Sequence, residues 1–155
     1  METSDERASS ALVVLGNPLG TYPVSNSDIP QLLEYCKDPN PAVRQMAIFQ
    51  LQQLVTTSFY DDILPLIIDG DLSVSRNAKE LLLTNERESI PVFRKGLKSE
   101  NRDMRLKSLD LLVELNDKES LSDVIELFLD PDPDVVTRAI NASAKLADVN
   151  DKILY

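Results

Sequence analysis

The chain of 155 residues contains no histidine, no tryptophan and a single cysteine. Without histidine, the sequence excludes Ser–His and Cys–His nucleophile pairs, a histidine general base and a His-ligated metal. One cysteine excludes an internal disulfide and fits a reducing compartment. We therefore expect a non-catalytic protein with no bound metal and no cofactor.

Basic residues are few, and long hydrophobic runs are lacking. The 16 Lys and Arg stand against 26 Asp and Glu, which gives a net charge of −10. This charge argues against binding to nucleic acid or to an anionic membrane, because both depend on basic side chains. The apolar run at residues 11–15 is shorter than the roughly 7–15 residues of a secretion signal or the roughly 20 of a membrane span. We expect a soluble, cytoplasmic protein without membrane insertion.

A turn sequence recurs along the chain at a nearly constant spacing. Asp-Pro-Asn-Pro-Ala-Val at residues 38–43 returns as Asp-Pro-Asp-Pro-Asp-Val at residues 130–135, and degenerate copies begin at Asp69 and Ser99. The four starting positions are almost evenly spaced, as expected of a repeat with a fixed period. Aspartate and asparagine at these turns suit helix caps, so we expect Asp38, Asp69 and Asp130 to cap the helices that follow.

Apolar residues before and after each turn fall at spacings of three and four, which is typical of one face of a helix. Four residues after the aliphatic residue of each turn stands a small one, which would let paired helices approach closely: Ala47, Ala78, Ser108 and Ala139. Hairpins that cannot bury their apolar faces alone must stack. The pattern predicts an all-α fold, a right-handed α-solenoid of about four helix–turn–helix repeats. The predicted repeats are residues 28–57, 58–87, 88–117 and 118–148 of a domain at residues 28–155.

The turn and its flanks resemble the HEAT-repeat family, in the short variety that occurs in bilin-lyase-like proteins of the phycobilisome. The motif Leu-x-x-Leu-x-Asp-Pro-x-Pro-x-Val-Arg-x-x-Ala is matched best from Leu33 through Asp38 and Arg44 to Ala47. The motif arginine is also present as Arg105, whereas Ser75 and Val136 occupy the other two positions. The resemblance covers most of the chain and implies a repeat fold more specifically than a function.

The second helix of each repeat offers a candidate binding surface, because solenoids commonly bind partners on this ridge. If Val43, Ala47 and Leu54 are buried, a rotation of about 100° per residue puts positions 45, 49 and 52 on the opposite side. Ile48, Leu109 and Ile140 would flank this ridge. In the alternative interpretation the helices are rotated and these apolar residues belong to the core. The predicted partner-binding residues are Arg44, Gln45, Phe49, Arg76, Leu83, Arg105, Leu106, Val113 and Asn141.

The favoured function is a protein–protein interaction module: an adaptor, assembly factor or chaperone-like subunit. Apolar anchors inside a polar rim would provide affinity, and the acidic charge would favour a partner with a basic or mixed apolar surface. The resemblance implies an alternative, a subunit of a bilin lyase or other tetrapyrrole-handling factor acting on phycobiliproteins. Such a subunit would form a hetero-oligomer with another HEAT-type or light-harvesting subunit.

Three local features have two interpretations each. Residues 1–27 form an acidic tip and an apolar cap on the first repeat, or a segment that docks on a partner. Cys36 lies on the buried stripe as a small hydrophobe, or is a reactive thiol. The apolar residues 153–155 pack back on the last repeat, or meet another chain.

Overall fold

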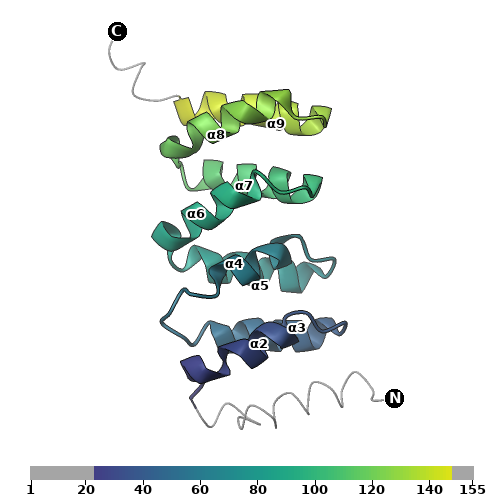
Figure 1. Cartoon of the computed structure of the whole chain (residues 1–155), viewed down its shortest axis with the longest axis vertical. Coiled ribbons are helices and arrows are strands. Elements are labelled where there is room, and N and C mark those ends of the chain that lie inside the picture. Colours follow the sequence, from purple (N-terminus) through teal and green to yellow (C-terminus); the bar gives the residue numbers. More distant parts are fainter. Residues whose placement is uncertain (1–22, 148–155) are drawn as a thin grey trace. The chain divides into compact units, whose positions relative to one another are not determined.

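The structure is a computed structural model that describes residues 23–147, so the predictions for residues 1–22 and 148–155 lie outside the described residues. Regular structure between residues 23 and 147 is entirely helical. The chain divides into two compact units, Met1–Asn85 and Glu86–Tyr155. The predicted all-α class, with helical hairpins of the α-solenoid type, is confirmed (Figure 1).

The first unit contains two hairpins, each with a first helix, a short turn and a longer second helix. Within this unit α3 packs against α5. The short 3-10 helix η1 precedes the first hairpin, and in the second hairpin a turn of α-helix passes into 3-10 helix. The elements are η1 (Asn26–Asp28), α2 (Ile29–Tyr35), α3 (Pro41–Leu51), α4 (Tyr60–Ile63), η2 (Leu64–Ile68) and α5 (Leu72–Leu83).

The second unit repeats this arrangement, with α6 against α7, α8 against α9, and α7 packed on α9. Figure 1 shows the two pairs in green and yellow. The elements are α6 (Glu86–Gly96), α7 (Arg102–Glu114), η3 (Lys118–Ser120), α8 (Leu121–Glu126), η4 (Leu127–Leu129) and α9 (Pro133–Ala147).

The second helices begin at polar caps, but these are not the predicted aspartates. Asn40 accepts the backbone N–H of Ala42, and Asp71 and Asn101 cap α5 and α7 in the same way. The prediction for Asp38, Asp69 and Asp130 is therefore wrong by two positions. Each of the three instead accepts the backbone N–H two positions further on, at 2.8–2.9 Å, and so shapes the turn that leads into the cap.

The core consists of the predicted stripes. Both helices of each hairpin contribute buried residues. The first helices contribute Leu32, Ile63, Phe93 and Val124, and the second helices contribute Val43, Val74, Met104 and Val135. The four small residues Ala47, Ala78, Ser108 and Ala139 are completely buried. The α6–α7 crossing is especially close, because a Cβ added to Gly96 would lie 2.0 Å from Ser108 Oγ and 3.0 Å from Ser108 Cβ.

This close crossing predicts that Gly96→Ala destabilises the protein. Alanine favours helix by about 1 kcal/mol over glycine, but overpacking a tight contact costs about 1–3 kcal/mol. Because the added Cβ would meet Ser108 so closely, we take the upper end of the overpacking range and expect a net loss of about 2 kcal/mol in urea unfolding. The matched control is Gly70→Ala, because no atom lies within 4 Å of a Cβ there. Adding Ser108→Ala removes the hydroxyl and should recover part of the loss; equal stability of the Gly96→Ala and Gly70→Ala variants would contradict the tight crossing.

Candidate partner-binding ridge

Arg44 lies at the start of α3, where its guanidinium joins two successive turns of the first unit. Its Nη1 donates to the carbonyl oxygens of Asp38 and Pro39, at 2.8 and 3.1 Å. Its Nη2 donates to Asp69 Oδ1 in the next hairpin at 2.8 Å, and both side chains are largely buried. A guanidinium with these contacts is not presented to a partner.

Arg105 makes the same set of contacts in the second unit. Its Nη1 donates to the carbonyl oxygens of Ser99 and Glu100, at 3.0 Å each. Its Nη2 and Nε approach the two carboxylate oxygens of Asp130, at 3.0 and 2.8 Å. The placement of Arg44 and Arg105 on the ridge is therefore corrected: both residues fasten one hairpin to the next, and we call these two contact sets the arginine clamps.

The other predicted residues of the first unit lie on α3 and α5. Phe49 is 58% exposed, which is unusual for a large aromatic side chain, and Arg76 is also exposed. Leu83 is half-buried. Gln45 is half-buried, and its Nε2 lies 3.4 Å from Asp71 Oδ1 at the start of α5. Gln45 therefore contributes to contact between the hairpins.

Two of the three residues that were predicted to flank the ridge lie in the core instead. Ile48 and Leu109 are completely buried, whereas Ile140 is about half exposed. A second helix of a stacked hairpin is covered on two sides, by its own first helix and by the neighbouring hairpin. The buried arc is therefore wider than the stripe of a helix that packs on one side only.

In the second unit, two of the predicted residues line one groove between α7 and α9. Val113 and Asn141 face this groove of about 230 Å³, with Ala142 beside them. Leu106, one of the predicted apolar anchors, is half-buried and is not among the groove's lining residues. The groove lies between the two second helices of this unit.

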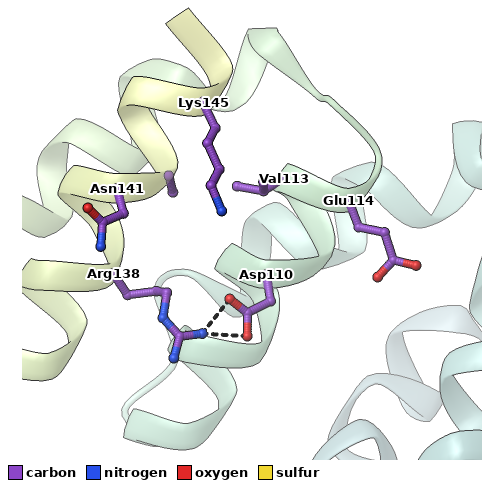
Figure 2. Close-up of a pocket in the computed structure, with 7 residues that line it drawn as sticks. Asp110, Val113, Glu114, Arg138, Asn141 and Lys145 are labelled. Atoms are coloured by element: carbon purple, nitrogen blue, oxygen red, sulfur yellow. Dashed lines mark hydrogen bonds and ion pairs between the residues drawn. The ribbon is translucent and has the colours of Figure 1, made fainter. Parts of the chain in front are cut away.

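Charged residues complete the groove, and sequence reasoning did not select them. Asp110 and Arg138 form an ion pair across it, with Arg138 Nη1 at 2.5 and 2.6 Å from the two carboxylate oxygens. Figure 2 shows Lys145 extending from α9 towards Val113 of α7, with Glu114 at the other side. Two acids and two bases leave the groove without net charge. Pairing of Asp110 with Arg138 could have been predicted from the sequence, because the two residues carry opposite charges and lie close to one repeat length apart.

Cys36 is buried at the end of the first helix of the first unit, as the hydrophobic interpretation expects. Burial, reinforced by the nearby Asp62 carboxylate and opposed by Lys37, raises the pKa of this thiol to about 12. The thiol therefore stays protonated at neutral pH.

Within residues 23–147 there is no group of three or more His, Cys, Asp or Glu side chains placed to hold a metal ion. No helix in this described part of the chain is long and apolar enough to cross a membrane.

Comparison with known families gives one match. The family model for the HEAT repeat matches residues 29–58, which comprise α2, α3 and the loop that follows them. A comparison with curated proteins gives no match. The matched segment contains Arg44 and the carbonyl of Asp38 that it binds, whereas the acid of the first arginine clamp, Asp69, lies in the next hairpin. The chain thus carries a HEAT repeat at residues 29–58, as its resemblance to the HEAT-repeat family predicted.

Proposed function

We propose that the chain is a protein-binding module that uses the ridge of its second helices as an adaptor or assembly factor. HEAT repeats generally mediate contacts between proteins, and stacked repeats offer extended binding surfaces. The observation that carries the proposal is the groove between α7 and α9, which combines apolar and charged side chains.

The size of the groove favours a protein side chain over a small molecule. Sites for small molecules commonly enclose about 300–1,000 Å³, and this groove of about 230 Å³ is smaller. Val113 and Ala142 offer apolar contact, while Asn141 and Lys145 offer hydrogen-bond donors. The complementary ligand is a segment of a partner protein with an apolar side chain flanked by polar ones. No observation favours the bilin-handling alternative over this function.

The proposal predicts that ridge variants lose partners without losing the fold. We expect Phe49→Asp and Val113→Glu each to lower, at least about tenfold, the amount of a partner protein captured from a native extract. A carboxylate introduced at an apolar contact residue would have to lose its hydration on binding, which is unfavourable. The readout is quantitative mass spectrometry of proteins captured by each immobilised variant.

The matched control is Val55→Asp, because Val55 is 99% exposed in the loop after α3 and the substitution introduces the same charge off the ridge. All variants must first show the helical circular dichroism and melting of the wild type. Equal capture by the ridge variants and the Val55 control would rule out the ridge as the binding surface.

A further inference from the structure

The groove between α7 and α9 contains a cation that no side chain between residues 23 and 147 neutralises. Asp110 and Arg138 satisfy one another, with Arg138 Nη1 at 2.5 and 2.6 Å from the two carboxylate oxygens. Lys145 also lines the groove, is exposed, and forms no ion pair or hydrogen bond with its side chain in that part of the chain. The ammonium of Lys145 is therefore available to an anionic ligand.

Apolar side chains lie beside this ammonium. Lys145 extends from α9 towards Val113 of α7 (Figure 2), and Val113 is half-buried. Ala142, which is only 3% exposed, lines the same groove. Asn141 is exposed and stands four residues before Lys145, so their side chains are neighbours on one face of α9. An apolar wall, a cation and an amide thus meet within about 230 Å³.

A carboxylate is the group that complements Lys145 and Asn141. The ammonium has three N–H donors and no acceptor, and the amide of Asn141 provides two more donors. A carboxylate accepts hydrogen bonds from both, and the positive charge of the lysine strengthens its bond. Glu114 lies at the other side of the groove (Figure 2) and repels an anion near α7. The two sides together direct a carboxylate towards α9.

The small size of the groove restricts where that carboxylate is attached. In an extended peptide, successive side chains point to opposite faces, and side chains on the same face are roughly 6–7 Å apart along the chain. An apolar side chain and an acidic side chain of one segment therefore do not enter a groove of about 230 Å³ together readily. The C-terminal residue of a protein carries its side chain and a free carboxylate on the same Cα, so it meets both requirements at once.

The net charge of the protein also favours a single carboxylate over an acidic segment. The chain carries a charge of −10, which repels a ligand with several acidic residues. One carboxylate at Lys145 is attracted locally, whereas further acids in the same ligand would face the acidic surface of the protein. The residues that precede the carboxylate in the ligand are therefore neutral or basic.

We propose that the groove between α7 and α9 binds the C-terminal residue of a partner protein. Its aliphatic side chain lies against Val113 and Ala142, and its free carboxylate accepts hydrogen bonds from Lys145 and Asn141. The assignment rests on the proposed protein-binding function and specifies the partner as an exposed chain end with an aliphatic last residue.

A peptide library in two chemical forms tests the proposal. Octapeptides with degenerate sequences are synthesised with either a free C-terminal carboxylate or a C-terminal amide, and mass spectrometry identifies those that the immobilised full chain retains. We expect the free acids to be enriched at least about tenfold over the amides, because the amide lacks the charge that Lys145 binds. Among the retained acids, Val, Leu and Ile should predominate at the last position.

Titration of the most enriched peptide locates the binding site. The methyl NMR signals of Val113 and Ala142 should shift in the wild type. Lys145→Gln should raise the dissociation constant for the acid at least about tenfold and remove the preference for acid over amide. The matched control is Lys118→Gln, which makes the same change of charge at an exposed lysine of η3 that does not line the groove. This variant should bind like the wild type.

Three results would overturn the proposal: equal retention of acids and amides, equal binding by the two glutamine variants, and binding of free leucine as tight as that of the peptide. Failure of this assignment is distinguishable from failure of the protein-binding function. If Val113→Glu abolishes capture from the native extract while acids and amides are retained equally, the groove binds proteins but not through a chain end. If Phe49→Asp and Val113→Glu leave capture unchanged and neither peptide form is retained, both the function and the assignment are wrong.

Discussion

Asp130→Asn should lower the free energy of unfolding by about 3 kcal/mol, the largest effect expected from a change of one charge in this protein. The side chains of Arg105 and Asp130 are only 11% and 4% exposed. Removing one partner of a buried ion pair leaves the other charge buried without compensation, which typically costs about 3–5 kcal/mol. Asparagine keeps the shape of the side chain and an oxygen that can accept the N–H of Asp132, so the loss reports on charge. Urea unfolding followed by circular dichroism measures it.

The matched control is Asp110→Asn, which breaks the ion pair with Arg138 in the same unit. The side chains of Arg138 and Asp110 are 47% and 48% exposed, and exposed pairs contribute less than about 1 kcal/mol. A double-mutant cycle with Arg105→Met should show strong coupling to Asp130. If the two asparagine variants were equally stable, the clamp at Arg105 would contribute no more than a surface ion pair.

Cys36 in the folded chain should react with iodoacetamide at least about a hundredfold more slowly than in the urea-unfolded chain. Its pKa of about 12 compares with 9.0 for a free thiol, so the thiolate fraction at pH 8 is about a thousandfold smaller. The greater nucleophilicity of a high-pKa thiolate offsets part of this factor, and burial of the sulfur opposes the reaction further. Mass spectrometry of the alkylated chain at timed intervals gives both rates.

The same burial makes stability depend on alkaline pH. The pKa is raised in the folded state, so the thiolate forms first in the unfolded state; stability is retained below about pH 9 and falls as pH rises towards about 12. The Cys36→Ala variant has no thiol, so its free energy of unfolding should not show this fall at alkaline pH, whatever its stability at pH 8. Rapid alkylation of the folded chain, or equal alkaline loss in both proteins, would show that the thiol is not desolvated as the structure indicates.

The hairpins were predictable from sequence because their signal is periodic and local. The turn recurs at almost equal spacing, and the apolar stripes around it lie in the core, from Leu32 and Val43 to Val124 and Val135. Helix and turn formation depend on close neighbours in the sequence, and such spacing is visible in a single chain. The caps were misplaced by two positions, since Asp38 and Asn40 both suit the turn and only backbone geometry separates a cap from the residue that shapes the turn.

The candidate site was only partly predictable. The position of a residue around the helix axis shows whether it lies on the buried side or on the opposite side. It does not show whether a residue between these two sides contacts a neighbouring hairpin or is exposed to solvent. Arg44 follows the buried Val43 and is rotated from it by about 100° around the helix axis, so its side chain could have faced either solvent or the next hairpin. The structure shows the second case. A long-range signal was present in the sequence: Arg44 occurs with Asp69 and Arg105 with Asp130, whereas Ser75 and Ser99 occupy the equivalent pair of positions between them.

The arginine clamps also constrain how a chain of this kind can gain or lose length. Each clamp takes its arginine from one repeat and its aspartate from the following one, at Arg44 with Asp69 and at Arg105 with Asp130. Loss of the second repeat alone would leave Arg44 followed by a repeat whose turn begins with Ser99, and its charge would have no acid to receive it. Loss of two consecutive repeats that share a clamp leaves every remaining clamp arginine with its acid. In this protein the segment that can be duplicated or deleted without isolating a charge is therefore a pair of repeats.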